Sequence, residues 1–132
     1  MSSGLYTIGV AALLKADIDL EADDIEAVLI DTTYYTVDLT EDSTLEDIPE
    51  SARLSLATLS GKTVVGRVFN CDSITFSAVS GAKADALVLF YSSDEEENCT
   101  LLAYIDNATE FPITPDDTDI TITIDPTGVF EL

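Results

Sequence analysis

The segment from Ala84 to Tyr91, ADALVLFY, is apolar at every position except Asp85. A run of this length, with the turn Ser80-Gly81 before it and a polar stretch over 92–98 after it, is typical of a strand buried on both faces. Ile25 to Ile30 and Leu101 to Ile105 are similarly apolar. We therefore expect strands at all three places, with 84–91 in the centre of a sheet.

Two further segments, Ser73 to Val79 and Ile120 to Ile124, alternate apolar and polar residues, which is typical of strands with one buried face. The apolar residues are Ile74, Phe76 and Ala78 in the first segment and Ile120, Ile122 and Ile124 in the second. Thr32 to Leu39 and Thr63 to Asn70 also have strand-like composition, and Gly66 is interpreted as a bulge in the second of them. Short strands separated by turns every 8–12 residues or so are typical of antiparallel sandwiches and barrels.

The N-terminal part favours one short helix instead. Tyr6, Val10, Leu13 and Leu14 have the spacing of one helical face, and Ser2 and Ser3 can cap the helix. Gly9 weakens this expectation by about 1 kcal/mol. The predicted fold is therefore mainly β, an antiparallel β-sandwich or jelly-roll-like barrel with one short N-terminal helix. We expect a single domain over 1–132, with the helix and lead-in over 1–20 and the β-sandwich over 21–132.

The charge of the chain limits its partners. The sequence has 26 Asp and Glu against 5 Lys and Arg, a net charge of −21, yet it is 46% hydrophobic. Disordered acidic tails have few apolar residues, so this composition indicates a folded core with an acidic surface. The few cations are scattered, which argues against binding to nucleic acid or to anionic membranes. No basic leader or membrane-length apolar run is found, so we expect synthesis in the cytoplasm.

Catalytic chemistry is not indicated. The chain has no histidine, which removes the usual general base and the commonest metal ligand. Carboxylate pairs arise by chance among so many acids, and Trp, a common sugar-stacking residue, is absent. We therefore expect no enzymatic activity, and assign no catalytic, cofactor-binding or metal-binding residue and no cofactor. The partner-binding residues are left unassigned.

Three acidic clusters could hold Ca²⁺, but none has EF-hand spacing, so we interpret them as solvated loops. They are Asp23-Asp24, Asp94-Glu95-Glu96-Glu97, and Asp116-Asp117 with Asp119. The two cysteines, Cys71 and Cys99, are interpreted as small half-buried thiols, and a single disulfide is the alternative.

An ordered set of segments from Ile25 to Leu132 resembles a family of small virion structural proteins of tailed bacteriophages, similar to head decoration or cement proteins. The segments are 27–32, 35–37, 47–49, 52–53, 59–64, 68–72, 75–81, 86–89, 102–106, 111–115 and 119–122. The chain departs from the family at turns that are usually glycine-rich: Ser93 to Glu96, Glu110, and Asp116 to Thr118. An aromatic residue expected near Ile124 is also missing.

The resemblance implies a non-enzymatic capsid decoration protein on the exterior of the virion. Its partner would be the major capsid protein, and it would form a homo-oligomer such as a trimer. The alternatives are a tail, neck or fibre-associated virion protein, or an adhesin module that binds carbohydrate on a host surface. The acidity is interpreted either as adaptation to salty surroundings, where screening lets carboxylates crowd together, or as a means of solubility alone.

Overall fold

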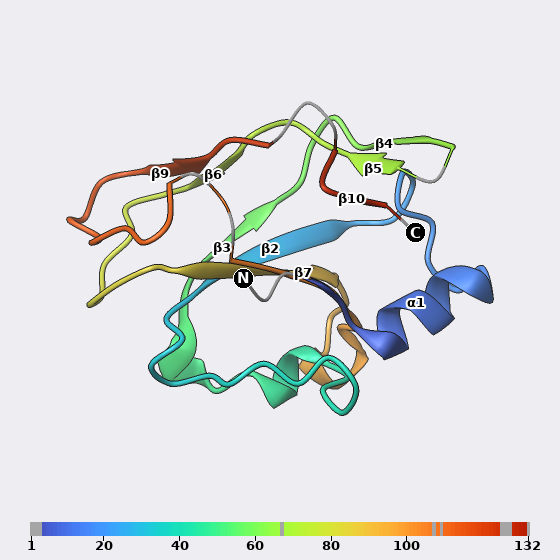
Figure 1. Cartoon of the computed structure of the whole chain (residues 1–132), viewed down its shortest axis with the longest axis horizontal. Coiled ribbons are helices and arrows are strands. Elements are labelled where there is room, and N and C mark those ends of the chain that lie inside the picture. The colour runs from blue at the N-terminus through green and yellow to red at the C-terminus, as the bar shows by residue number, and fades with distance from the viewer. Residues whose placement is uncertain (1–3, 67, 107, 109, 125–127, 132) are drawn as a thin grey trace.

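The computed structural model describes residues 4–66, 68–106, 108, 110–124 and 128–131. Within them the chain is mainly β, with antiparallel sheets and one α-helix near the N-terminus, α1 (Thr7–Leu14). Figure 1 shows three layers, with a large sheet in the middle, small strands above it and an irregular segment below it. The upper two layers form a small β-sandwich, as the sequence predicted.

The middle layer is a five-stranded sheet with the order β1-β8-β7-β2-β3. Its strands are β1 (Gly4–Leu5), β2 (Ile25–Ile30), β3 (Arg53–Thr58), β7 (Ala86–Tyr91) and β8 (Leu101–Ile105). The predicted bounds of β2 and β8 are confirmed, and the apolar run 84–91 supplies β7. Both faces of β2 are buried: Ala27 and Leu29 join the core above the sheet, while Val28 and Ile30 join the core below it.

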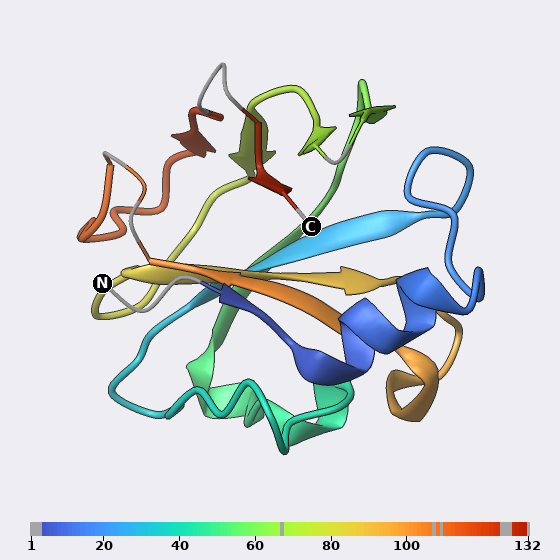
Figure 2. The same ribbon diagram turned by 45° about the vertical axis from the view of Figure 1, so that its right-hand side comes forward.

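The upper layer is made of two small sheets (Figure 2). A three-stranded sheet has the order β10-β5-β4, and β6 pairs with β9. The strands are β4 (Thr63–Val65), β5 (Val68–Asn70), β6 (Ile74–Phe76), β9 (Ile120–Ile122) and β10 (Phe130–Glu131). The alternation of Ile120 and Ile122 is confirmed, since both are buried while Thr121 between them is exposed.

Two local predictions in this layer are wrong. Gly66 is not a bulge but part of the turn of a hairpin, because β4 and β5 pair with each other and Val65 lies opposite Val68. Its φ of +62° suits a glycine in a tight turn. The alternation of 73–79 ends at Phe76, because Ala78 has a φ of +45° and is exposed while Val79 is buried instead.

The lower layer is residues 31–52, which lack regular strands. It contains two short 3₁₀ turns, η1 (Leu45–Asp47) and η2 (Glu50–Ala52). The prediction of a strand over Thr32 to Leu39 is wrong, because turn and side-chain contacts take its first N–H groups. Thr32 N–H donates to Asp85, Thr33 N–H to the Asp31 side chain and Tyr34 N–H to the Asp31 carbonyl.

A chain of hydroxyl groups holds this layer to the sheet. The Tyr35 hydroxyl donates to Asp42 Oδ2 at 2.6 Å and accepts from the Tyr6 hydroxyl at 2.7 Å. Both rings are buried, and burial raises the pKa of both phenols. Sequence reasoning missed this contact, because Tyr6 and Tyr35 are 29 positions apart.

We expect Tyr35→Phe to destabilise the protein by about 1–3 kcal/mol, because the fully buried Tyr6 hydroxyl loses its partner. Urea unfolding followed by circular dichroism measures the change. Tyr34→Phe is the matched control, since Tyr34 is 55% exposed, and should change the free energy of unfolding by less than about 0.5 kcal/mol. Equal effects in the two variants would contradict this role for Tyr35.

Helix α1 lies against β8 through Gly9. A Cβ built on Gly9 would lie 2.4 Å from the Leu101 carbonyl oxygen and 2.8 Å from the Leu102 Cα. The predicted apolar face is only partly confirmed. Val10 and Leu13 are half-buried, but Leu14 is 78% exposed, so the prediction is wrong at that position. Ser2 and Ser3 lie outside the described residues, and Tyr6 holds the N-cap position without a side-chain cap bond. No helix in the described part of the chain is long and apolar enough to cross a membrane.

Candidate functional site

Aspartates in two of the three acidic clusters accept hydrogen bonds from backbone N–H groups. Asp116 Oδ1 accepts the Thr118 N–H at 3.3 Å, and Asp119 Oδ1 accepts the Ala78 N–H at 3.0 Å. Asp23 Oδ2 accepts the Asp19 N–H at 2.9 Å. Among the described residues no group of three or more Asp, Glu or Cys side chains is placed to hold a metal ion.

The same use of carboxylates recurs through the loops of the molecule. Asp19, for example, accepts the N–H groups of Glu21 and Ala22. Within the described residues, the aspartates that accept a backbone N–H include Asp19, Asp23, Asp31, Asp38, Asp42, Asp47, Asp85, Asp116 and Asp119. Aspartate can replace a backbone carbonyl in such turns, so these side chains shape the loops besides supplying charge. Interpreting the clusters only as solvated loops missed this role.

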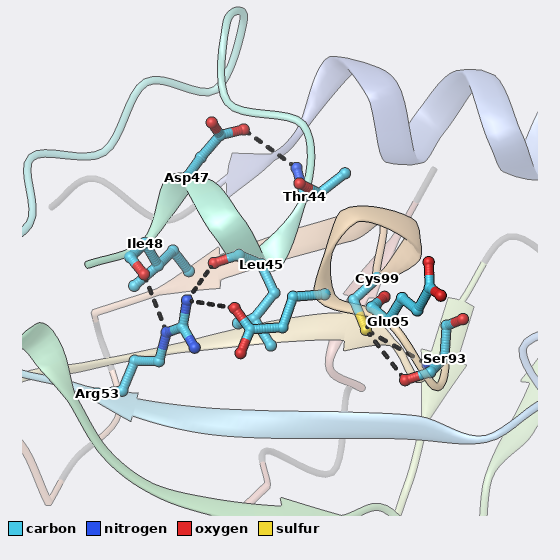
Figure 3. Close-up of polar contacts among 9 residues, drawn as sticks. Thr44, Leu45, Asp47, Ile48, Arg53, Ser93, Glu95 and Cys99 are labelled. Carbon is cyan, nitrogen blue, oxygen red and sulfur yellow. Dashed lines mark hydrogen bonds and ion pairs between the residues drawn. The ribbon is translucent and has the colours of Figure 1, made fainter. Parts of the chain in front are cut away.

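Three of the cations contact groups of the same chain, and one of them, Arg53, has a side chain that is only 15% exposed. Figure 3 shows its guanidinium group beside η1, where Nε donates to the Ile48 carbonyl at 2.9 Å and Nη2 to the Leu45 carbonyl at 2.7 Å. Nη2 also pairs with Glu96 at 3.0 Å, and this contact lowers the pKa of Glu96. Arg53 therefore joins β3, the lower layer and the turn η3 (Glu96–Asn98).

Lysines make similar internal contacts. Lys62 Nζ donates to the Asp23 carbonyl, and Lys83 Nζ pairs with Asp85 Oδ2 at 3.1 Å. Lys15 ends helix α1 and is exposed, and Arg67 lies outside the described residues. Because these cations are turned to groups of the same chain, the surface offered to a partner is dominated by carboxylates.

An open depression of about 360 Å³ lies near the start of β7. It is lined by Thr32, Lys83, Asp85, Tyr104, Asp106, Phe111 and Pro112. Burial opposes ionisation of Asp85, but hydrogen bonds from Thr32 and the contact with Lys83 lower its pKa. Burial raises the pKa of Tyr104 to about 12. Asp85 ties Thr32 to the start of β7, so the ionic groups that line the depression have a structural use.

Both cysteines are free thiols, as predicted, and form no disulfide; they are buried, however, and not half-buried. Burial raises the pKa of Cys71 to about 11 and also raises that of Cys99. The Cys99 thiol contacts the Ser93 backbone and the Glu95 carbonyl, as Figure 3 shows for Ser93. Raised pKa values and burial make both thiols poor nucleophiles.

The surface also has a strand edge with apolar side chains. All three residues of β4 are exposed, and Val64 and Val65 have 42% and 76% of their surface exposed. β4 is the last strand of its sheet, with β5 on one side. On the other side the Val64 N–H donates to Glu21 Oε2 at 3.3 Å. Sequence reasoning missed this edge because Gly66 was interpreted as a bulge within one longer strand. The available signal was the glycine between two short apolar pairs, Val64-Val65 and Val68-Phe69.

We expect the melting temperature to climb between dilute buffer and 1 M NaCl, because salt screens repulsion among carboxylates that carry a net charge of −21. A rise of 5 °C or more, which corresponds to about 1–2 kcal/mol, would be measured by thermal circular dichroism. A variant with Glu46→Gln and Glu50→Gln, both exposed, should show a smaller rise. A flat response to salt would contradict salt adaptation.

No model of a known protein family matches this chain. No curated protein matches it either. Neither comparison assigns a family, so the resemblance to virion proteins remains a prediction.

Proposed function

We propose that this chain is a non-enzymatic structural protein of a tailed-phage virion, and that it decorates the outer face of the shell formed by the major capsid protein. It would be made in the host cytoplasm and act as a homo-oligomer on the particle. The resemblance of the segments between Ile25 and Leu132 to virion proteins supports this proposal.

The observation that carries the proposal is the distribution of charge. Carboxylates cover the loops, while Arg53, Lys62 and Lys83 are turned to groups of the same chain. A surface of one sign steers a small protein towards a surface of the opposite sign and speeds their encounter. A basic patch on the shell is therefore the complementary partner, and nucleic acid is not.

Stabilisation of the shell would come from many weak contacts. Each copy would bridge neighbouring capsid subunits, and the buried area would be multiplied by the number of copies. The sheet buried on both faces gives a rigid body for this clamp, since its core residues on β2 and β7 are almost fully enclosed. Rigid partners lose little conformational entropy on binding.

Quantitative mass spectrometry of purified virions tests the proposal. We expect the protein in hundreds of copies per particle, counted against the major capsid protein. Tens of copies or fewer would favour the tail, neck or fibre alternative. Absence from the particles would overturn any virion role.

A further inference from the structure

We propose that the outer edge of β4 is the docking strand of this protein, to which a basic β-strand of the shell protein adds by displacing Glu21 from the Val64 amide. This inference rests on the proposed function and names the surface and the chemistry of the contact. The partner strand is identified by exposed backbone groups together with Lys or Arg side chains.

The backbone N–H of Val64 points to the open side of β4. In an antiparallel pair, residues alternate between those whose N–H and C=O groups bond the neighbouring strand and those whose groups point away from it. The Val64 N–H donates to Glu21, which lies in the loop between α1 and β2, so it points away from β5. Val64 therefore offers its backbone to a strand on the open side of β4.

Apolar side chains lie exposed beside that edge. Val64 and Val65 point to opposite faces of the sheet, because successive strand residues alternate. Both are exposed on a three-residue strand, and a Cβ built on Gly66 in the adjoining turn meets nothing within 4 Å. An added strand would thus gain main-chain hydrogen bonds from β4 and an apolar contact on each face, which is how strand addition combines affinity and specificity.

The negative charge of Glu21 at the β4 edge favours a basic partner strand. A second copy of this chain, pairing through the same edge, would bring a second Glu21 carboxylate beside the first. Like charges placed together disfavour such pairing. A strand with Lys or Arg, in contrast, would draw the Glu21 carboxylate from the amide and pair with it. The Glu21 contact, at 3.3 Å, then covers the edge until a basic partner arrives, as charged groups often cover free strand edges.

Binding of purified protein to shells assembled from the major capsid protein alone tests the inference. Val64→Pro removes the N–H and blocks strand pairing, while a proline on an edge, at an N–H that does not bond the neighbouring strand, is compatible with the fold. Val64→Thr is the matched control, because it keeps the N–H. We expect at least tenfold weaker binding for Val64→Pro, and a change of less than about threefold for Val64→Thr.

Hydrogen exchange of the wild-type protein gives a second readout that does not depend on the folding of a variant. The Val64 amide should exchange more slowly on the shell than in free protein. Glu21→Gln should bind with a weaker dependence on salt, because one ion pair is lost.

The outcomes separate the two proposals. Failure of wild-type protein to bind the shells would overturn both the docking strand and the decoration function. Binding that is unchanged in Val64→Pro, without protection of the Val64 amide, would overturn the docking strand alone. Self-association of the free protein that Val64→Pro abolishes would assign the edge to a second copy and overturn the choice of a basic partner.

Discussion

Replacement of Arg53 by Met should lower the free energy of unfolding by about 2–4 kcal/mol. Arg53 supplies donors to the Ile48 and Leu45 carbonyls and to Glu96, and its side chain is only 15% exposed. Met keeps most of the apolar stem but leaves the Ile48 carbonyl without this donor. The change should appear in urea unfolding as a lower midpoint with an unchanged slope.

Lys15→Met is the matched control, because it removes one positive charge from an exposed position at the end of α1. It should cost less than about 1 kcal/mol. Arg53→Lys keeps the charge but cannot reproduce the two-nitrogen geometry, so most of the loss should remain. If the two Met variants were equally stable, net charge and not the contacts of Arg53 would be responsible.

Gly9→Ala should also destabilise the protein, by about 1–3 kcal/mol, although alanine is the better helix former. On helix propensity alone the substitution would stabilise α1 by about 1 kcal/mol. The added Cβ, however, would lie 2.4 Å from the Leu101 carbonyl oxygen of β8. Because β8 is held between β1 and β7, its backbone cannot move aside as a flexible side chain can. The sign of the change therefore distinguishes the two effects.

Thermal and urea unfolding measure this sign. Ala11→Gly in the same helix calibrates propensity, because Ala11 is half-buried and should lose about 1 kcal/mol on substitution. Stabilisation by Gly9→Ala would mean that α1 does not pack on β8 as the structure has it.

The strands that the sequence predicts best are those made of short, almost wholly apolar runs. β2 and β8 have the predicted bounds, because a short apolar run that is buried on both faces has no polar side to place in water. The alternation of Ile120 and Ile122 similarly predicts β9. The acidic surface also follows from composition.

The segment 32–39 could not be predicted in the same way. Its Thr, Tyr and Val residues have strand propensity, yet Asp31, Asp42 and Asp85 take its donors and bend it into an irregular layer. Strand propensity is weak next to such contacts, because it mainly measures how a side chain packs on a pleated surface.

The candidate site shows the same division. Glu21 and Val64 are 43 positions apart, and nothing in the sequence indicates that they meet. Only folding brings the Glu21 carboxylate to the Val64 amide. Likewise the count of 26 acids predicts a negative surface but not which aspartates hold loops together.

Composition and periodicity thus settle the class of fold, the helix near the N-terminus and the sign of the surface, since these depend on which residues must leave water. The pairing of β4 with β5, the contact of Gly9 with β8 and the exposure of the β4 edge depend on segments that meet only when the chain closes. Such contacts are set by the geometry of packing between distant segments, which no local pattern of residues contains.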